Sequence, residues 1–320
     1  MSEQSDEFAR YVEAQRLRLA NPNLDLQLIR DVADAMHVTA REPEGVTYAE
    51  QEINGVPALW CIPLDAAPNV ALLHSHMGGA IVGSMHAERK AAGHIARAAG
   101  MVSLVPNYRL APEHKFPAQL EDMEASYRWL LDTGYQAHHI ASVGVSVGGN
   151  LAVNLALRQR NQGRPGPGAV LAVSPWVDPA MSNATLDTHA GSDKFLTRQF
   201  LELFRSLWLD DTGVSYDDPR VNLLAADLTG LPPTAVYYGV EELLAGEAQD
   251  FTHRARLAGV DAASHSVEHG QHAFVSGAGY VPEADRAITD MGRWLRSALG
   301  TRPDETSPTP PRHDPIGEPR

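Results

Sequence analysis

The 320-residue sequence predicts an α/β fold in which a mostly parallel central sheet carries helices on both faces. Short, continuously apolar segments such as VALLH (70–74) and AVLAVS (169–174) are typical of strands that are buried on both faces. Amphipathic helical segments separate them, which is the pattern of parallel strands joined by helical crossovers. Hydrophobic residues make up 43% of the chain, enough for a substantial core.

The individual elements follow in chain order from about residue 45. VTYAEQEI and VPALWCI are expected to be two strands, and the Asn-Gly between them favours a hairpin. The apolar pattern predicts further strands at 70–74, 102–106, 140–144, 169–174, 234–239 and 263–268. The helical pattern predicts helices at 86–99, 117–132, 149–160, 245–259 and 282–299.

Other segments stand outside this alternation. Residues 1–44 have apolar residues at helical spacing on both sides of an Asn-Pro-Asn break, so two helices are expected there, lying across the main domain. Residues 180–230 contain the helical run FLTRQFLELFRSLWL and are expected to be an insertion over the edge of the sheet. The main domain is then 45–300, and the proline-rich, charged residues 301–320 are expected to be a disordered tail.

Composition limits the classes of function. The formal net charge of −14 argues against binding to nucleic acid. The single cysteine, Cys61, excludes an intramolecular disulfide and is expected to be a buried core thiol. The acidic N-terminus does not resemble a signal peptide, and no apolar run is long enough to span a bilayer. We therefore expect a cytoplasmic protein that does not contact a membrane.

The stretch VGVSVGGNLA (143–152) places Ser146 between Gly144 and Gly148, where a predicted strand meets a predicted helix. Gly-x-Ser-x-Gly at such a junction predicts a nucleophile elbow, because the turn is too tight for side chains beside the serine. The serine is expected in a strained conformation at a helix N-terminus, where developing negative charge is stabilised. The alternative is a glycine-rich turn with an incidental serine.

A serine hydroxyl is a weak nucleophile unless a base accepts its proton. In this kind of fold the acid and then the histidine follow the serine, each in a loop after a later strand. The segment SVEHGQHAFVSG offers His269 and His272 as the base, and VEELLAGE offers Glu241 and Glu242 as the acid. The residue types alone leave both choices open.

A serine that attacks a carbonyl carbon also needs backbone donors for the oxyanion that forms. We expect one donor at the N–H of Val147 and others in the loop HSHMGGAIVGS, where Gly78 and Gly79 permit close approach of a substrate. His74 and His76 in that loop could instead hold a metal, but no third ligand is indicated nearby.

Several sequence blocks between about residues 70 and 275 resemble the hormone-sensitive-lipase-like branch of the α/β-hydrolases, whose bacterial members are carboxylesterases. The blocks are HMGGAIVGS (76–84), NYRLAPEHKFPAQLED (107–122), GVSVGGN (144–150), SPWVD (174–178) and HAF (272–274). The resemblance implies an α/β-hydrolase fold with a helical cap made by residues 1–44 and 180–230.

The resemblance also chooses among the candidates. The acid motif of the family, counted back from 258–260, falls on Glu242, with Glu241 as second choice, and its His-x-Phe favours His272 over His269. It implies ester hydrolysis without metal or organic cofactor, with a small-molecule ester as the substrate. The residues implied in catalysis are Ser146, Glu242 and His272, with oxyanion donors at Gly78, Gly79 and Val147.

The sequence departs from the family pattern around the expected pocket. Met77 replaces the first glycine of the oxyanion block and, with Trp176, is a candidate pocket residue. The branched Val147 is expected to crowd the acyl site. The phenylalanines of the insertion are more often core or cap packing than ligand contacts: Phe195, Phe200 and Phe204. Arg109 and Glu113 are expected to form a structural ion pair.

Alternatives to an esterase remain at this stage. The same residues could act on a lactone, formamide, carbamate or other amide. A non-catalytic ligand-binding protein or a protein-interaction scaffold is disfavoured because Ser146 and His272 are both present. A helical cover favours short to medium acyl chains, and the family resemblance suggests a homodimer.

Overall fold

The computed structural model describes residues 2–21 and 23–301. Within them the strands are β1 (Val46–Ile53), β2 (Val56–Pro63), β3 (Ala71–Ser75), β4 (Val102–Pro106), β5 (Ile140–Val145), β6 (Ala169–Val173), β7 (Thr234–Gly239) and β8 (Ala262–Val267). The helices that alternate with them are α3 (Met85–Ala99), α4 (Ala118–Asp132), α5 (Val147–Asn161), α8 (Ala245–Leu257) and α9 (Pro282–Ala298). Each predicted strand and helix of the alternation is present.

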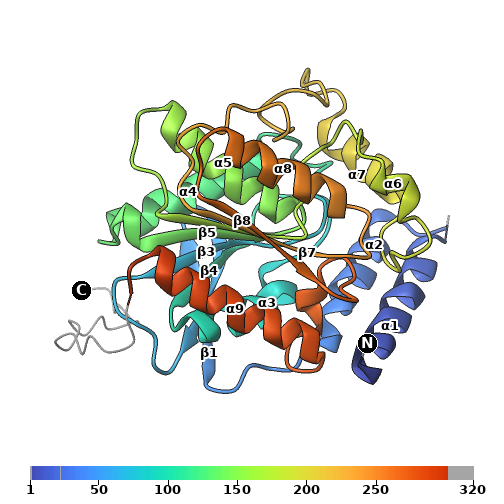
Figure 1. Ribbon diagram of the computed structural model, residues 1–320, viewed down its shortest axis with the longest axis horizontal. Coiled ribbons are helices and arrows are strands. Elements are labelled where there is room, and N and C mark those ends of the chain that lie inside the picture. The colour runs from blue at the N-terminus through green and yellow to red at the C-terminus, as the bar shows by residue number, and fades with distance from the viewer. Residues whose placement is uncertain (1, 22, 302–320) are drawn as a thin grey trace.

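The strands form one eight-stranded sheet in the order β1-β2-β4-β3-β5-β6-β7-β8 (Figure 1). All neighbouring pairs from β4 to β8 are parallel, whereas β2 is antiparallel to both β1 and β4. The predicted hairpin is confirmed. Its two turn residues, Asn54 and Gly55, have φ values of 50° and 84°, as expected for the tight turns that match the twist of paired strands.

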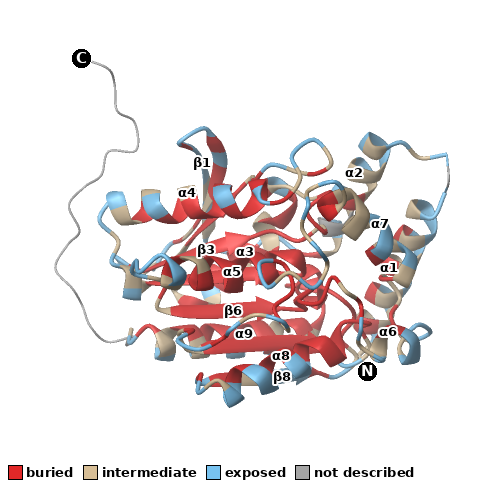
Figure 2. Cartoon of the chain, turned by 90° about the horizontal axis from the view of Figure 1, so that it is seen from above, coloured by how far each residue is buried: buried red, intermediate tan, exposed pale blue. Residues whose placement is uncertain are grey.

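Helices cover both faces of the sheet (Figure 1). Helices α3 and α9 pack together on one face, and α4, α5 and α8 cover the other. Seen from above in Figure 2, the sheet lies in the buried interior. Cys61 is fully buried in the cluster on the α3 side, and this burial raises the pKa of its thiol to about 12. The prediction of a core thiol is therefore confirmed.

The segments outside the alternation gather at one end of the molecule. They are α1 (Glu3–Leu19), α2 (Leu26–Asp34), α6 (Thr185–Thr188) and α7 (Arg198–Leu209) (Figures 1 and 2). The N-terminus of α1 is capped by Ser2, that of α2 by Asp25 and that of α7 by Thr197. Capping oxygens satisfy N–H groups that the first turn leaves unbonded, so each helix begins where its sequence provides one.

Arg30 of α2 joins this end to the main domain. Its guanidinium donates to the carbonyls of Ile81 and Ala111 and forms an ion pair with Glu113 at 2.7 Å. The expected pairing of Arg109 with Glu113 is therefore wrong. Arg109 instead binds Asp122 on α4 at 2.8 Å.

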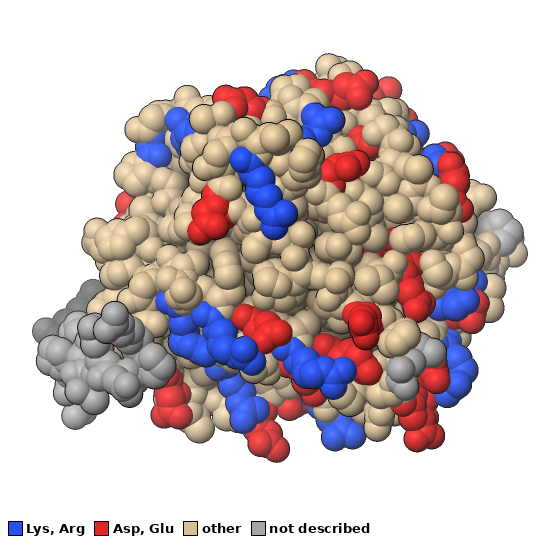
Figure 3. Space-filling model, viewed as in Figure 1, with Lys and Arg blue, Asp and Glu red and all other residues tan. Residues whose placement is uncertain are grey.

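Charge is distributed without one dominant sign on the face shown in Figure 3, where acidic and basic side chains are interspersed. Among the described residues, none of the helices is both long and apolar enough to cross a bilayer. The predicted disordered tail falls almost wholly on residues 302–320, which lie outside the described residues.

Candidate active site

Ser146 lies in a turn of one residue between β5 and α5. Its φ and ψ are 57° and −123°, a conformation that L residues rarely adopt and that persists only where the surrounding structure imposes it. A Cβ on Gly144 would stand 2.0 Å from the Gly148 carbonyl oxygen, and one on Gly148 would stand 2.1 Å from the Ser75 oxygen. The glycines are thus required by backbone contact, as the elbow motif predicts. The helix begins at Val147, earlier than the expected residue 149, because Ser146 alone separates the strand from the helix.

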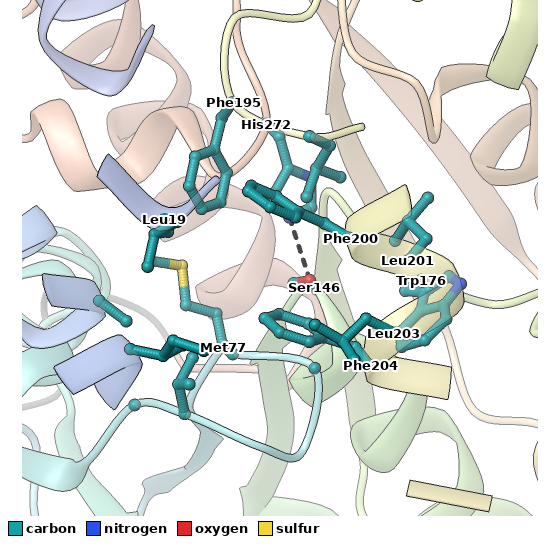
Figure 4. Close-up of a pocket in the computed structure, with 17 residues that line it drawn as sticks. Leu19, Met77, Ser146, Trp176, Phe195, Phe200, Leu201, Leu203, Phe204 and His272 are labelled. Carbon is teal, nitrogen blue, oxygen red and sulfur yellow. Dashed lines mark hydrogen bonds between the residues drawn. The ribbon is translucent and has the colours of Figure 1, made fainter. Parts of the chain in front are cut away.

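Three side chains from distant parts of the chain form a hydrogen-bonded series here. Nε2 of His272 lies 3.0 Å from Oγ of Ser146 (Figure 4). The other ring nitrogen, Nδ1, lies 3.2 Å from Oε2 of Glu242. Glu242 is fully buried, and Ser146 and His272 are 7% and 3% exposed. The series can move a proton from the serine hydroxyl to the imidazole while the carboxylate faces the other ring nitrogen.

The geometry separates the two glutamates and the two histidines that the sequence left open. Glu242 follows β7 and accepts the N–H of Gly239 at 3.2 Å while it faces His272. Glu241 points to the other histidine: its carboxylate lies 3.4 Å from Nδ1 of His269. Only the Glu242 and His272 pair therefore reaches Ser146.

Burial sets the protonation of this series. It lowers the pKa of His272 to about 4, because the charged imidazolium loses its hydration. Burial also raises the pKa of Glu242, whereas hydrogen bonds from Ser174 and Gly239 lower it and favour the carboxylate form. The imidazole is therefore neutral at neutral pH and can accept a proton.

The loop after β3 lies beside Ser146 and is held in a glycine-dependent conformation. Gly78 and Gly79 have φ values of 122° and 60°, and the N–H groups of Ile81 and Val82 both donate to the Gly78 carbonyl at 3.0 Å. The first N–H groups of a helix have no partner within the helix, and that of Val147 is the first of α5. Gly78 and Gly79 line the same cavity as Ser146, and Val147 follows that serine in the chain. Their role as oxyanion donors stays a prediction.

The histidines of this loop serve its structure. Nε2 of His74 lies 3.0 Å from the buried carboxylate of Glu88, which also accepts the N–H of Met77. The ring of His76 stacks on Tyr108 with centroids 3.8 Å apart. Across residues 2–21 and 23–301, no three His, Cys, Asp or Glu side chains are grouped as a metal site would require.

An apolar cavity of about 60 Å³ opens above Ser146. Met77 and Trp176 line it, as predicted. Its other apolar side chains come from α1, α2, α7, the segment before α7 and the loop after β3 (Figure 4): Leu19, Ile29, Ala33, Val82, Phe195, Leu196, Phe200, Leu201, Leu203 and Phe204. The phenylalanines expected to be packing residues therefore line the pocket. Apolar residues at helical spacing give the same sequence signal whether they face a core or a cavity.

Val147 does not crowd this cavity, contrary to the expectation from its branched side chain. It is fully buried in an apolar cluster that includes Trp176 and Leu244, and it is not among the residues that line the cavity.

A second hollow lies beside the cavity, lined by residues of α1, α2 and α7. This outer hollow of about 500 Å³ shares four lining residues with the cavity: Leu19, Ile29, Phe200 and Leu203. Leu17 and Leu203 at this hollow are 65% and 45% exposed. The hollow and the cavity are therefore adjacent, and the same apolar side chains line both.

The fold and this site define an α/β-hydrolase: a mostly parallel sheet with a serine elbow after β5 and the acid and histidine in loops after β7 and β8. A family model described as the alpha/beta hydrolase fold matches residues 72–276. The chain belongs to this family, and its relatives place it in the hormone-sensitive-lipase-like branch.

Three known proteins resemble this chain over most of its length. An acetyl-hydrolase of Streptomyces hygroscopicus is 34% identical over 232 residues, which are 72% of this chain and 76% of that protein. An esterase of Acinetobacter venetianus is 29% identical over 236 residues, 74% of this chain and 78% of that protein. The crystal structure of an esterase from the bacterial hormone-sensitive lipase family superposes with a TM-score of 0.89 at 34% identity, covering 94% of this chain and 99% of that one. The chain is a carboxylesterase-type hydrolase.

Proposed function

We propose that the chain hydrolyses short to medium acyl esters of small molecules through a Ser146–His272–Glu242 triad and an acyl-enzyme intermediate. The observation that carries this proposal is the hydrogen-bonded series in which His272 lies 3.0 Å from Ser146 and 3.2 Å from Glu242. It is supported by the neutral imidazole and by the open apolar cavity above the serine.

In the first half of the reaction, Oγ of Ser146 attacks the ester carbonyl carbon while Nε2 of His272 takes the hydroxyl proton. Glu242 holds the ring by its Nδ1–H and stabilises the imidazolium. The carbonyl π electrons move onto oxygen, where the backbone N–H groups of Gly78, Gly79 and Val147 receive the negative charge. The tetrahedral intermediate then expels the alcohol, which leaves with the proton from His272.

In the second half, water replaces the alcohol. His272 accepts a proton from water as the water oxygen attacks the acyl carbon bound to Ser146. The tetrahedral intermediate expels the serine oxygen, which recovers its proton from His272, and the carboxylic acid leaves. The enzyme returns to its starting state without any other reactant.

The cavity favours a small acyl group. Its volume is about 60 Å³, and one water-sized group needs about 10–15 Å³ on this measure, so about four to six such groups fit. The Streptomyces relative is named an acetyl-hydrolase, which fits the same size class. The helices α1, α2 and α7 would form the cap that limits this space, and a longer alcohol portion would extend into the outer hollow. A homodimer and a cytoplasmic location stay predictions.

Hydrolysis of p-nitrophenyl esters from acetate to palmitate tests the proposal. We expect the highest kcat/KM between acetate and octanoate, and loss of hydrolysis in Ser146→Ala at every chain length. The matched control is Ser142→Ala, which removes a buried hydroxyl on β5 away from the pocket. Wild-type preference for palmitate, or unchanged activity of Ser146→Ala, would contradict the proposal.

A further inference from the structure

The segment that leads into α7, residues 185–195, holds the loop that carries Glu242. Its side chains donate to three consecutive backbone carbonyls of that loop: Ser192 to Glu241 at 2.9 Å, His189 to Glu242 at 3.0 Å and Thr185 to Leu243 at 2.7 Å. A fourth bond runs the other way, because Asp193 accepts the N–H of Leu243 at 2.8 Å. The backbone around the proposed catalytic acid is therefore fixed by the inserted segment.

The same segment also reaches the loop that carries His272. The N–H of Lys194 donates to the side-chain oxygen of Gln271 at 2.6 Å. The ring of Phe195 lies nearly parallel to the imidazole of His272, with an interplanar angle of 14° and centroids 6.2 Å apart. Residues 193–195 thus touch both loops that supply partners to Ser146.

Asp193 is the charged member of this segment. Its side chain is fully buried and accepts three backbone N–H groups, those of Phe195, Leu196 and Leu243, each at 2.8 Å. Hydrogen bonds from backbone N–H groups stabilise an ionised carboxylate. Its charge acts on His272, and each of the two groups favours the charged form of the other. No sequence motif marked this residue, which lies in the irregular part of the insertion.

We propose that Asp193 is a positioning residue: a second carboxylate, supplied by the insertion, that fixes the Glu242 loop and stabilises the imidazolium of His272. The inference rests on the proposed function. It gives the insertion a role in the chemistry besides covering the pocket, because the segment that leads into the pocket-lining helix also carries a charge that acts on the base.

Apart from Glu242, the other groups around His272 supply no buried negative charge. Those that face the imidazole or its loop come from the serine elbow, the β7 loop, the insertion and the β8 loop: Ser146, Glu242, Glu241, His189, Asp193, Lys194 and His269. Glu241 is bound to Gln271 and His269. Glu242 and Asp193 are thus the fully buried carboxylates among these groups.

The pH dependence of kcat/KM for p-nitrophenyl butyrate, measured for the wild type and Asp193→Asn, tests the inference. Burial raises the pKa of Asp193 to about 6, so the wild type loses the carboxylate as the pH falls through that value. The Asn variant lacks this step, and its imidazole is also harder to protonate. We expect the maximal kcat/KM of Asp193→Asn to be about tenfold lower than that of the wild type. We also expect the fall of its kcat/KM at acid pH (the acid limb of the profile) to occur about one pH unit lower, since one pKa unit corresponds to tenfold.

Three further variants sharpen this test. Asp193→Glu keeps the charge and is expected to retain the wild-type acid limb. Asp193→Ser removes the charge without placing an amide NH2 group against the N–H of Leu243. It replaces Asp193→Asn in the measurement if the Asn variant does not fold. Asp187→Asn is the matched control, because Asp187 lies in the same segment but pairs with Arg198 at the surface.

A lower maximal kcat/KM together with an acid limb at lower pH, in Asp193→Asn or Asp193→Ser, supports the inference. A lower maximal kcat/KM with an unmoved limb, or no change in either, overturns it. Failure of the proposed function looks different, because the wild type would then show no hydrolysis that depends on Ser146. An active wild type, an inactive Ser146→Ala and an unmoved limb in Asp193→Asn would reject only the role of Asp193.

Discussion

The ring of Phe204 packs directly against Gly79. A Cβ on Gly79 would stand 2.3 Å from Cδ2 of that ring, and both residues line the cavity above Ser146. Phe204 comes from α7 in the insertion, whereas Gly79 belongs to the loop after β3. The insertion therefore places an aromatic wall against a proposed oxyanion donor, which limits the space beside the reacting carbonyl.

Replacing Phe204 by alanine is expected to shift the enzyme toward longer acyl chains. The substitution removes a ring from the wall of a small cavity, and each additional methylene bound in an apolar pocket changes the binding free energy by about 1–3 kcal/mol. We expect the ratio of kcat/KM for decanoate to that for acetate to rise about tenfold or more. The control is Leu207→Ala on the same helix, which packs against the apolar cluster without lining the cavity. An unchanged ratio in Phe204→Ala would refute this role.

Gly148→Ala is expected to destabilise the fold and abolish activity together. Its Cβ would meet the backbone oxygen of Ser75 at 2.1 Å, and backbone cannot move aside as a side chain can. Overpacking of this kind costs about 3 kcal/mol, so thermal unfolding monitored by circular dichroism should show a drop of several degrees. Gly166→Ala is the control, because its Cβ would make only ordinary contacts at 3.7 Å and beyond. If Gly148→Ala kept wild-type stability and activity, the elbow would have room for a Cβ beside the Ser75 oxygen, and this steric argument would be wrong.

Local patterns predicted the parts of the site that depend on neighbouring residues. Gly144 has a local steric reason, because its Cβ would meet the backbone of Gly148 four residues on. The contact of Gly148 is with Ser75 on β3, so the motif, and not a local contact, identified that glycine. Arg109 shows where this fails: its partner is Asp122 on α4, while Glu113 binds Arg30, 83 residues away in sequence. Asp193 was not found because its partners belong to loops that only the folded chain brings together.

The choice between adjacent glutamates gives a direct contrast. Glu242→Gln removes the charge that stabilises the imidazolium and is expected to lower kcat by about 10³- to 10⁴-fold, as loss of the acid does in serine triads. The side chain of Glu241 contacts Gln271 and His269 and does not reach His272. Because substitutions away from such a site usually have small effects, Glu241→Gln is expected to retain kcat within about threefold. Steady-state kinetics on p-nitrophenyl butyrate compares the two. The reverse order of effects would assign the acid to Glu241.

Cys61 is expected to be unreactive in the folded protein. It is fully buried, and its pKa is raised to about 12, so almost no thiolate forms at pH 8. Titration with a disulfide reagent such as DTNB should give no reaction in buffer and one thiol per chain in guanidinium chloride. Ester hydrolysis should survive exposure of the native enzyme to the reagent. Rapid modification with loss of activity would mean that the thiol is accessible.

Direct capture of the acyl-enzyme tests the central claim, that Ser146 is the nucleophile. The enzyme is mixed with p-nitrophenyl butyrate, quenched with acid within milliseconds, digested and analysed by mass spectrometry. We predict a butyryl group on the peptide that contains Ser146, and no acylated peptide from Ser146→Ala treated in the same way. A butyryl group on another residue, or hydrolysis by Ser146→Ala at the wild-type rate, would contradict the account.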